Sequence, residues 1–63
     1  PAQASIAVET TLTLQEMKLL DLEGRLLKVV YNRFMSLDDI QAGVYILEIQ
    51  TDKGSLNRKI IKQ

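Results

Sequence analysis

The chain has 63 residues, which is too few for architectures that need more than about 100, such as Rossmann or TIM-barrel enzymes. Eight basic and eight acidic side chains give no net charge, which argues against a nucleic-acid module, and no apolar run approaches the roughly 20 residues of a spanning helix. Cysteine and histidine are absent, so we expect no disulfide, no cofactor or metal, and no Ser-His-Asp or Cys-His catalytic group.

The first predicted element is a strand over residues 5–10. Ile6 and Val8 alternate with polar or small residues, as in a strand with one buried face. Leu12 and Leu14 continue the alternation with the same parity. This second stretch is compatible with a strand, a turn or both.

Two apolar runs then predict a β-hairpin. Residues 17–22 and 25–31 flank the dipeptide Glu23-Gly24. Gly24 can adopt a positive φ without a Cβ clash, as a short hairpin connection requires. We expect a turn stabilised by Asp21 rather than a calcium loop, because the ligand series of an EF-hand does not continue beyond Gly24.

A short strand and an irregular crossing follow the hairpin. Residues 34–37 predict the strand, and residues 39–43 predict an irregular segment or a single 3₁₀ turn that Gly43 ends. Asp38 and Asp39 are adjacent carboxylates, but neighbouring residues rarely converge on one proton. We therefore expect a solvated turn rather than a catalytic pair.

The last two predicted strands, residues 44–51 and 55–62, form a hairpin around a turn in which Gly54 takes a left-handed conformation. Alternation in the first of these strands predicts a core face made of Tyr45, Leu47 and Ile49. Six or seven short strands with hairpin turns predict an all-β fold, a small immunoglobulin-like antiparallel β-sandwich.

The C-terminal end is basic, with Lys53, Arg58, Lys59 and Lys62. Two interpretations remain open. The lysines can protect a sheet edge from strand addition by other chains, or the basic C-terminal end can bind an acidic partner.

Several motifs together resemble a known family. In chain order they are Asp21-x-x-Gly24-Arg25 within residues 20–26, then residues 36–38, residues 42–47 and residues 59–62. The ordered set resembles the C-terminal sorting domain of the type IX secretion system of Bacteroidota, with the likeness running from about Met17 to Gln63. The residues expected to shape this scaffold are Asp21, Gly24, Arg25, Gly43, Val44, Tyr45 and Gly54.

The resemblance implies a single non-enzymatic sorting domain over residues 1–63, with its first strand truncated at Pro1 and its cargo lying N-terminal to that residue. The cargo would cross the periplasm, meet the outer-membrane translocon and reach the cell surface or the exterior, with sortase removal of the domain in many members. We expect recognition to involve the last strand, through Lys59, Ile60, Ile61 and Lys62. Both lysines are predicted to face outward, with Ile60 or Ile61 facing inward. Gly24 and Gly43 are expected to set the backbone, either by adopting a positive φ or by allowing a close approach of neighbouring atoms.

Other functions are compatible with the same pattern. An immunoglobulin-like or fibronectin-like spacer needs no recognition event. A carbohydrate-binding module needs exposed aromatic rings, for which Tyr31, Phe34 and Tyr45 are available, although alternation places Tyr45 in the core. Open sheet edges and a neutral charge also allow a homodimer.

Overall fold

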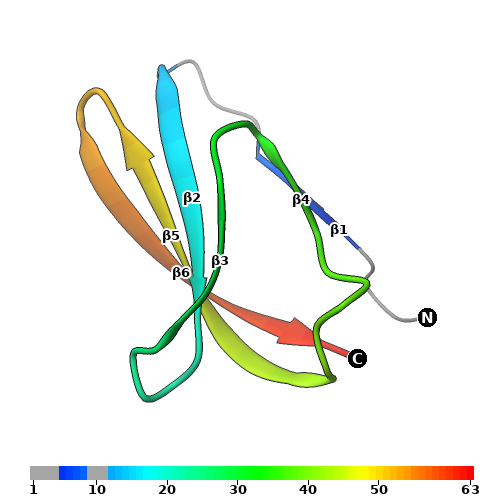
Figure 1. The fold of residues 1–63 in the computed structure, drawn as a ribbon. Helices are drawn as coiled ribbons and strands as arrows, with labels where there is room; N and C mark the ends of the chain where they lie inside the picture. Colours follow the sequence, from blue (N-terminus) through cyan, green and yellow to red (C-terminus); the bar gives the residue numbers. More distant parts are fainter. Residues whose placement is uncertain (1–4, 9–11) are drawn as a thin grey trace.

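The alternating sequence folds into six β-strands in the computed structural model, which describes residues 5–8 and 12–63. The strands are β1 (Ser5–Ala7), β2 (Leu14–Leu20), β3 (Leu26–Val30), β4 (Phe34–Ser36), β5 (Gly43–Thr51) and β6 (Gly54–Lys62). They form two antiparallel sheets (Figure 1). The all-β prediction is confirmed. Glu9 and Thr10, the end of the predicted first strand, lie outside the described residues.

The larger sheet has the order β3-β2-β5-β6 and contains both predicted hairpins. The β5–β6 hairpin pairs continuously from Gly43 opposite Lys62 to Thr51 opposite Gly54. Gly24 and Gly54 have φ values of 88° and 122°, as predicted for these turns. Strands β3 and β6 form the two edges of this sheet.

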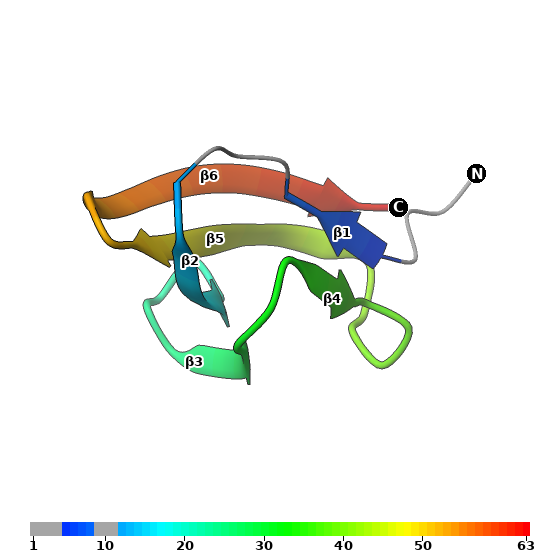
Figure 2. The same cartoon turned by 90° about the horizontal axis from the view of Figure 1, so that it is seen from above.

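The smaller sheet consists of β1 and β4, which lie across from β5 and β6 in Figure 2. Ile6 stands opposite Met35 in its register. Thus β1 pairs with a strand far along the chain rather than with β2, the next strand in sequence. This pairing places a second layer over part of the four-stranded sheet.

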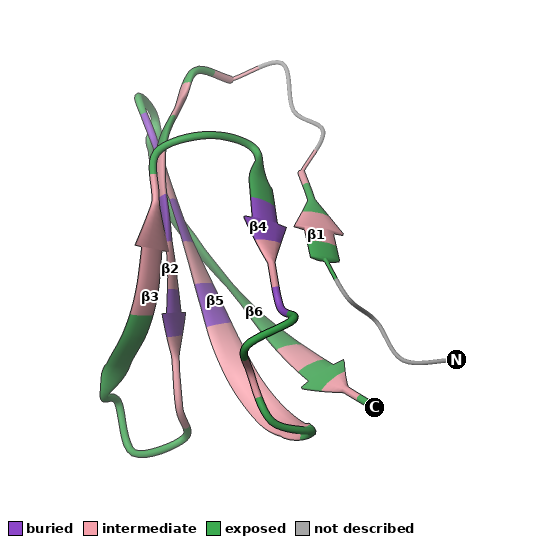
Figure 3. Ribbon diagram, turned by 45° about the vertical axis from the view of Figure 1, so that its right-hand side comes forward, coloured by how far each residue is buried: buried purple, intermediate pink, exposed green. Residues whose placement is uncertain are grey.

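The core lies between the two sheets. Its buried side chains are Met17, Leu19, Met35, Leu37, Leu47 and Ile49. Ile6, Val8 and Tyr45 pack against this cluster as predicted. Figure 3 marks the buried residues as bands on β2, β4 and β5. Burial of alternate residues on these strands agrees with the predicted period of two.

The crossing from β4 to β5 is an irregular turn rather than a 3₁₀ helix. The Ile40 N–H donates to the Leu37 carbonyl over 3.0 Å. Gly43 begins β5 and does not have a positive φ, so of the two roles expected for it, positive φ or close approach, the structure excludes the first. The Tyr45 ring covers Gly43, and an added Cβ would lie 3.5 Å from the Tyr45 Oη, which is ordinary contact distance.

Candidate recognition surface

The β6 strand and the turn before it form the most exposed continuous part of the chain. Every residue from Asp52 to Lys59 is exposed, and β6 pairs with β5 along one edge alone within the described structure (Figure 3). No strand among residues 5–8 and 12–63 pairs with its other edge, and the backbone N–H and C=O groups of such an edge readily accept an added strand. This geometry makes β6 the candidate recognition element.

The four residues predicted to be recognised divide between two faces of β6. Lys59 and Ile61 stand opposite Ile46 and Val44, on the face directed away from the core. Ile60 lies opposite Tyr45 and packs against the core. The prediction that Lys59 and Lys62 both face outward is therefore wrong for Lys62. Residues three apart on a strand point to opposite faces, so Lys62 shares the inner face with Ile60.

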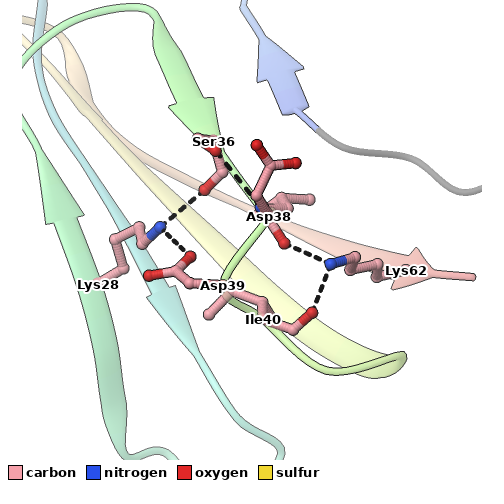
Figure 4. Close-up of polar contacts among 7 residues, drawn as sticks. Lys28, Ser36, Asp38, Asp39, Ile40 and Lys62 are labelled. Carbon is pink, nitrogen blue, oxygen red and sulfur yellow. Dashed lines mark hydrogen bonds and ion pairs between the residues drawn. The ribbon is translucent and has the colours of Figure 1, made fainter.

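Two lysines from opposite edges of the larger sheet hold the crossing between β4 and β5 (Figure 4). The Lys62 ammonium donates to the carbonyl oxygens of Leu37 and Ile40. Lys28, on β3, donates to the Ser36 carbonyl over 2.8 Å and to Asp39 Oδ1 over 2.5 Å. This arrangement, the lysine clamp, connects β3 and β6 through one loop.

The lysine clamp is absent from the sequence-based predictions, although the sequence contains a signal for it. Lys28 stands opposite Leu19 in the register, and Lys62 follows two residues after Ile60. Both lysines therefore occupy positions whose alternation points toward the core. A lysine at such a position needs a polar partner, and backbone carbonyls of an irregular loop can supply it.

The Asp21-x-x-Gly24-Arg25 motif builds the β2–β3 turn. Asp21 Oδ1 accepts the backbone N–H groups of Glu23 and Arg25, each over 2.9 Å, and Oδ2 accepts Arg25 Nε over 2.8 Å. The hydrogen bond from the Arg25 backbone N–H, with further help from the Arg25 side chain, lowers the pKa of Asp21 despite some opposing desolvation. The motif thus has an evident structural task at this turn.

Replacing Gly24 by alanine is expected to destabilise the domain by about 1–2 kcal/mol, because an L-residue resists the left-handed backbone conformation. Nothing stands within 4 Å of a Cβ at this position, so the cost is conformational rather than steric. Gly43→Ala is the matched control because Gly43 lacks a positive φ. Urea unfolding of both variants measures the difference, and equal losses would contradict this assignment.

Several carboxylates of the described residues form ion pairs with lysine or arginine. Asp39 pairs with Lys28 instead of Asp38, and the hydrogen bond from the Lys28 ammonium lowers the pKa of Asp39. No group of three or more His, Cys, Asp or Glu residues is placed to hold a metal within the described ranges. The same ranges contain no candidate for an apolar membrane-crossing helix. Asp38 and Asp39 therefore occupy a turn, as the sequence predicted.

The outer face of the larger sheet is apolar near the end of β6. Leu26, Leu20 and Ile46 form a cross-strand row on three neighbouring strands. The adjoining row adds Ile61, which is 57% exposed. Further along the same face, Lys18 pairs with Glu48 and the surface becomes polar. Exposed apolar area beside a free sheet edge is typical of a surface that meets a partner.

Charge is distributed unequally over this neutral chain. Residues 52–63 contain four basic and one acidic side chains, a net charge of +3. Residues 1–51 contain four basic and seven acidic side chains, a net charge of −3. The β5–β6 turn and β6 are therefore a basic strip against an acidic remainder.

The fold and this surface define a small all-β domain, whose distinctive feature is a basic, exposed edge strand. The family model of the secretion system C-terminal sorting domain matches residues 1–63, so the chain belongs to that family. The resemblance to type IX sorting domains is thereby confirmed. No curated protein and no solved structure gives a significant match.

Membership of this family assigns a role in secretion. A domain of this kind is a C-terminal sorting signal for type IX secretion, which leads to the cell surface or the extracellular space. Such a signal interacts with the secretion machinery, and the cargo lies N-terminal to it in the same chain. The family is in general non-catalytic.

Proposed function

We propose that this domain is a non-catalytic label that the type IX outer-membrane translocon reads on a folded β scaffold. The cargo first crosses into the periplasm through an ordinary signal peptide, and a sortase then removes the domain and attaches the cargo at the surface. The observation that carries the proposal is the exposed outer edge of β6 in a chain that belongs to the sorting-domain family. Residues 1–63 act as one recognition unit.

The recognised part of β6 is its outward face together with its free edge. Lys59 and Ile61 are the exposed members of the predicted set, and they adjoin the apolar row that contains Ile46. Ile60 and Lys62 serve recognition indirectly, because their inward contacts position the strand. A strand that is held by its inner face presents its outer face in one orientation.

Deletion of residues 59–63 from a fluorescent cargo fusion is expected to abolish surface delivery, because it removes the recognised end of β6. Ile61→Lys tests the same surface without shortening the chain, and it is expected to lower delivery about tenfold, equivalent to roughly 1.4 kcal/mol of contact energy. Surface fluorescence on intact cells and retained cargo in cell fractions measure both effects.

Leu22→Lys is the matched control, since Leu22 and Ile61 are exposed to 66% and 57% and both changes introduce a lysine. Leu22 lies on the β2–β3 turn, and β5 separates β2 from β6 in the order of the sheet. Normal delivery of the Leu22 variant with loss in the Ile61 variant supports the proposal. Unchanged export of the deletion variant would refute it.

A further inference from the structure

A groove opens where the smaller sheet stops covering the larger one. It lies between β1 and the β5–β6 hairpin and has a volume of about 470 Å³. Ile6 and Val8 line one side, while Leu56 and Ile60 line the other. This volume falls within the range of about 300–1,000 Å³ that is typical of ligand pockets, and the walls are apolar.

The outer edge of β6, which borders the groove, has no strand partner within the part of the chain that the structure describes. Within the described residues, β6 pairs with β5 alone and β1 pairs with β4 alone. The outer edge of β6 can therefore form main-chain hydrogen bonds with an added strand. Side chains of such a strand alternate between its two faces, so every second one can enter the groove.

The charge beside the groove identifies the chemistry of its occupant. Arg58 and Lys59 also line the groove, and neither forms an ion pair with any residue that the structure describes. Lys18, Arg25 and Lys28, in contrast, all pair with carboxylates. An apolar groove with two cations that lack an acidic partner among the described residues complements a segment in which apolar and acidic side chains alternate.

We propose that this groove receives an extended acidic segment of a translocon protein, which adds as a strand to the free edge of β6. The inference rests on the proposed secretion function and specifies the chemistry of the partner. Apolar side chains of the segment contact Leu56 and Ile60 on the groove face, and its carboxylates pair with Lys59 on the opposite face. Arg58 shares the groove face with Leu56 and Ile60 and adds positive charge at this edge. A second copy of β6 is a poorer occupant, since it would bring the same two cations against this edge.

Fluorescence anisotropy of the 63-residue chain tests the proposal with a labelled, capped octapeptide of alternating glutamate and valine. The matched probe replaces glutamate with lysine. We expect the acidic peptide to bind at least about tenfold more tightly than the basic one, with binding that weakens at high salt as ionic screening increases. The double variant Arg58→Glu with Lys59→Glu is expected to lose this binding.

Lys53→Glu is the control, because it introduces the same acidic side chain in the basic strip but outside the groove lining. Circular dichroism establishes that each variant is folded. Equal binding of the two peptides, or full binding by a folded double variant, would overturn the proposal. Sedimentation measures whether the domain forms a dimer as its concentration rises. A dimer that cannot bind the peptide would also overturn the proposal, because the occupant of the groove would then be a second copy of the chain.

The same double variant on a secreted cargo separates this inference from the proposed function. Loss of export with the control variant exported normally supports an acidic partner at the groove. Normal export of the double variant refutes the groove assignment but leaves the sorting role intact. A fusion whose unaltered domain fails to direct export contradicts the sorting role itself, whatever the peptide titration shows.

Discussion

Leu19→Ala is expected to unfold most of the protein population. Leu19 is fully buried on β2, between Lys28 of β3 and Leu47 of β5 in the sheet register. Truncating such a side chain costs about 2–5 kcal/mol through lost burial and the cavity that remains. A core in a chain of this size supplies roughly 3–5 kcal/mol of net stability, so the loss is comparable with the whole. Circular dichroism and urea titration measure it.

Leu22→Ala provides the control, because Leu22 is 66% exposed and its truncation is expected to cost less than about 0.5 kcal/mol. Similar losses in the two variants would contradict the assignment of the core. The Leu19 and Leu22 variants also test whether the secretion machinery requires a folded domain. If the unfolded Leu19 variant directs export as well as the Leu22 variant, the machinery reads a linear segment rather than the folded scaffold.

Lys62→Met is expected to destabilise the fold by about 1–3 kcal/mol, because two backbone carbonyls lose a charged hydrogen-bond donor. Lys28→Met, at the other side of the lysine clamp, removes the contacts to Ser36 and Asp39 and is expected to have a similar effect. Both lysines hold the same loop, so releasing one reduces what the other can contribute. The double variant should therefore lose less than the two single losses combined.

Urea unfolding of the wild type, both single variants and the double variant measures the four free energies of unfolding that this double-mutant cycle requires. Lys59→Met is the control for removing a lysine from β6, since Lys59 is exposed and has no partner among the described residues. Its change should lie within about 0.5 kcal/mol of zero. Fully additive losses for Lys28 and Lys62, or a Lys59 variant as unstable as the Lys62 variant, would contradict the clamp.

Local signals in the sequence predicted the elements whose contacts are local. Gly24 and Gly54 mark the two hairpin turns, and each has the positive φ that its position requires. The alternation of Leu47 and Ile49 identified a buried face, which the structure confirms. These features depend on a few neighbouring residues, so a short window of sequence contains the information.

Features that depend on distant residues could not be predicted in the same way. Nothing near Ile6 specifies that its strand will lie opposite Met35, because that pairing follows from how the two sheets share one core. The inward position of Lys62 follows from strand parity, but its partners on the β4–β5 crossing become evident only in the fold. The groove arises from the same distant pairing and has no local signature. Immunoglobulin-like connectivity and a homodimer stay predictions.

The division of charge between residues 52–63 and the remainder also affects how the domain approaches other molecules. A neutral body with opposite charges at its two parts behaves as an electric dipole, which a charged surface rotates before any contact forms. An anionic surface would turn β6 toward itself and repel the acidic remainder. The domain would then be oriented with β6 toward that surface before contact, although its net charge of zero gives no attraction at long range.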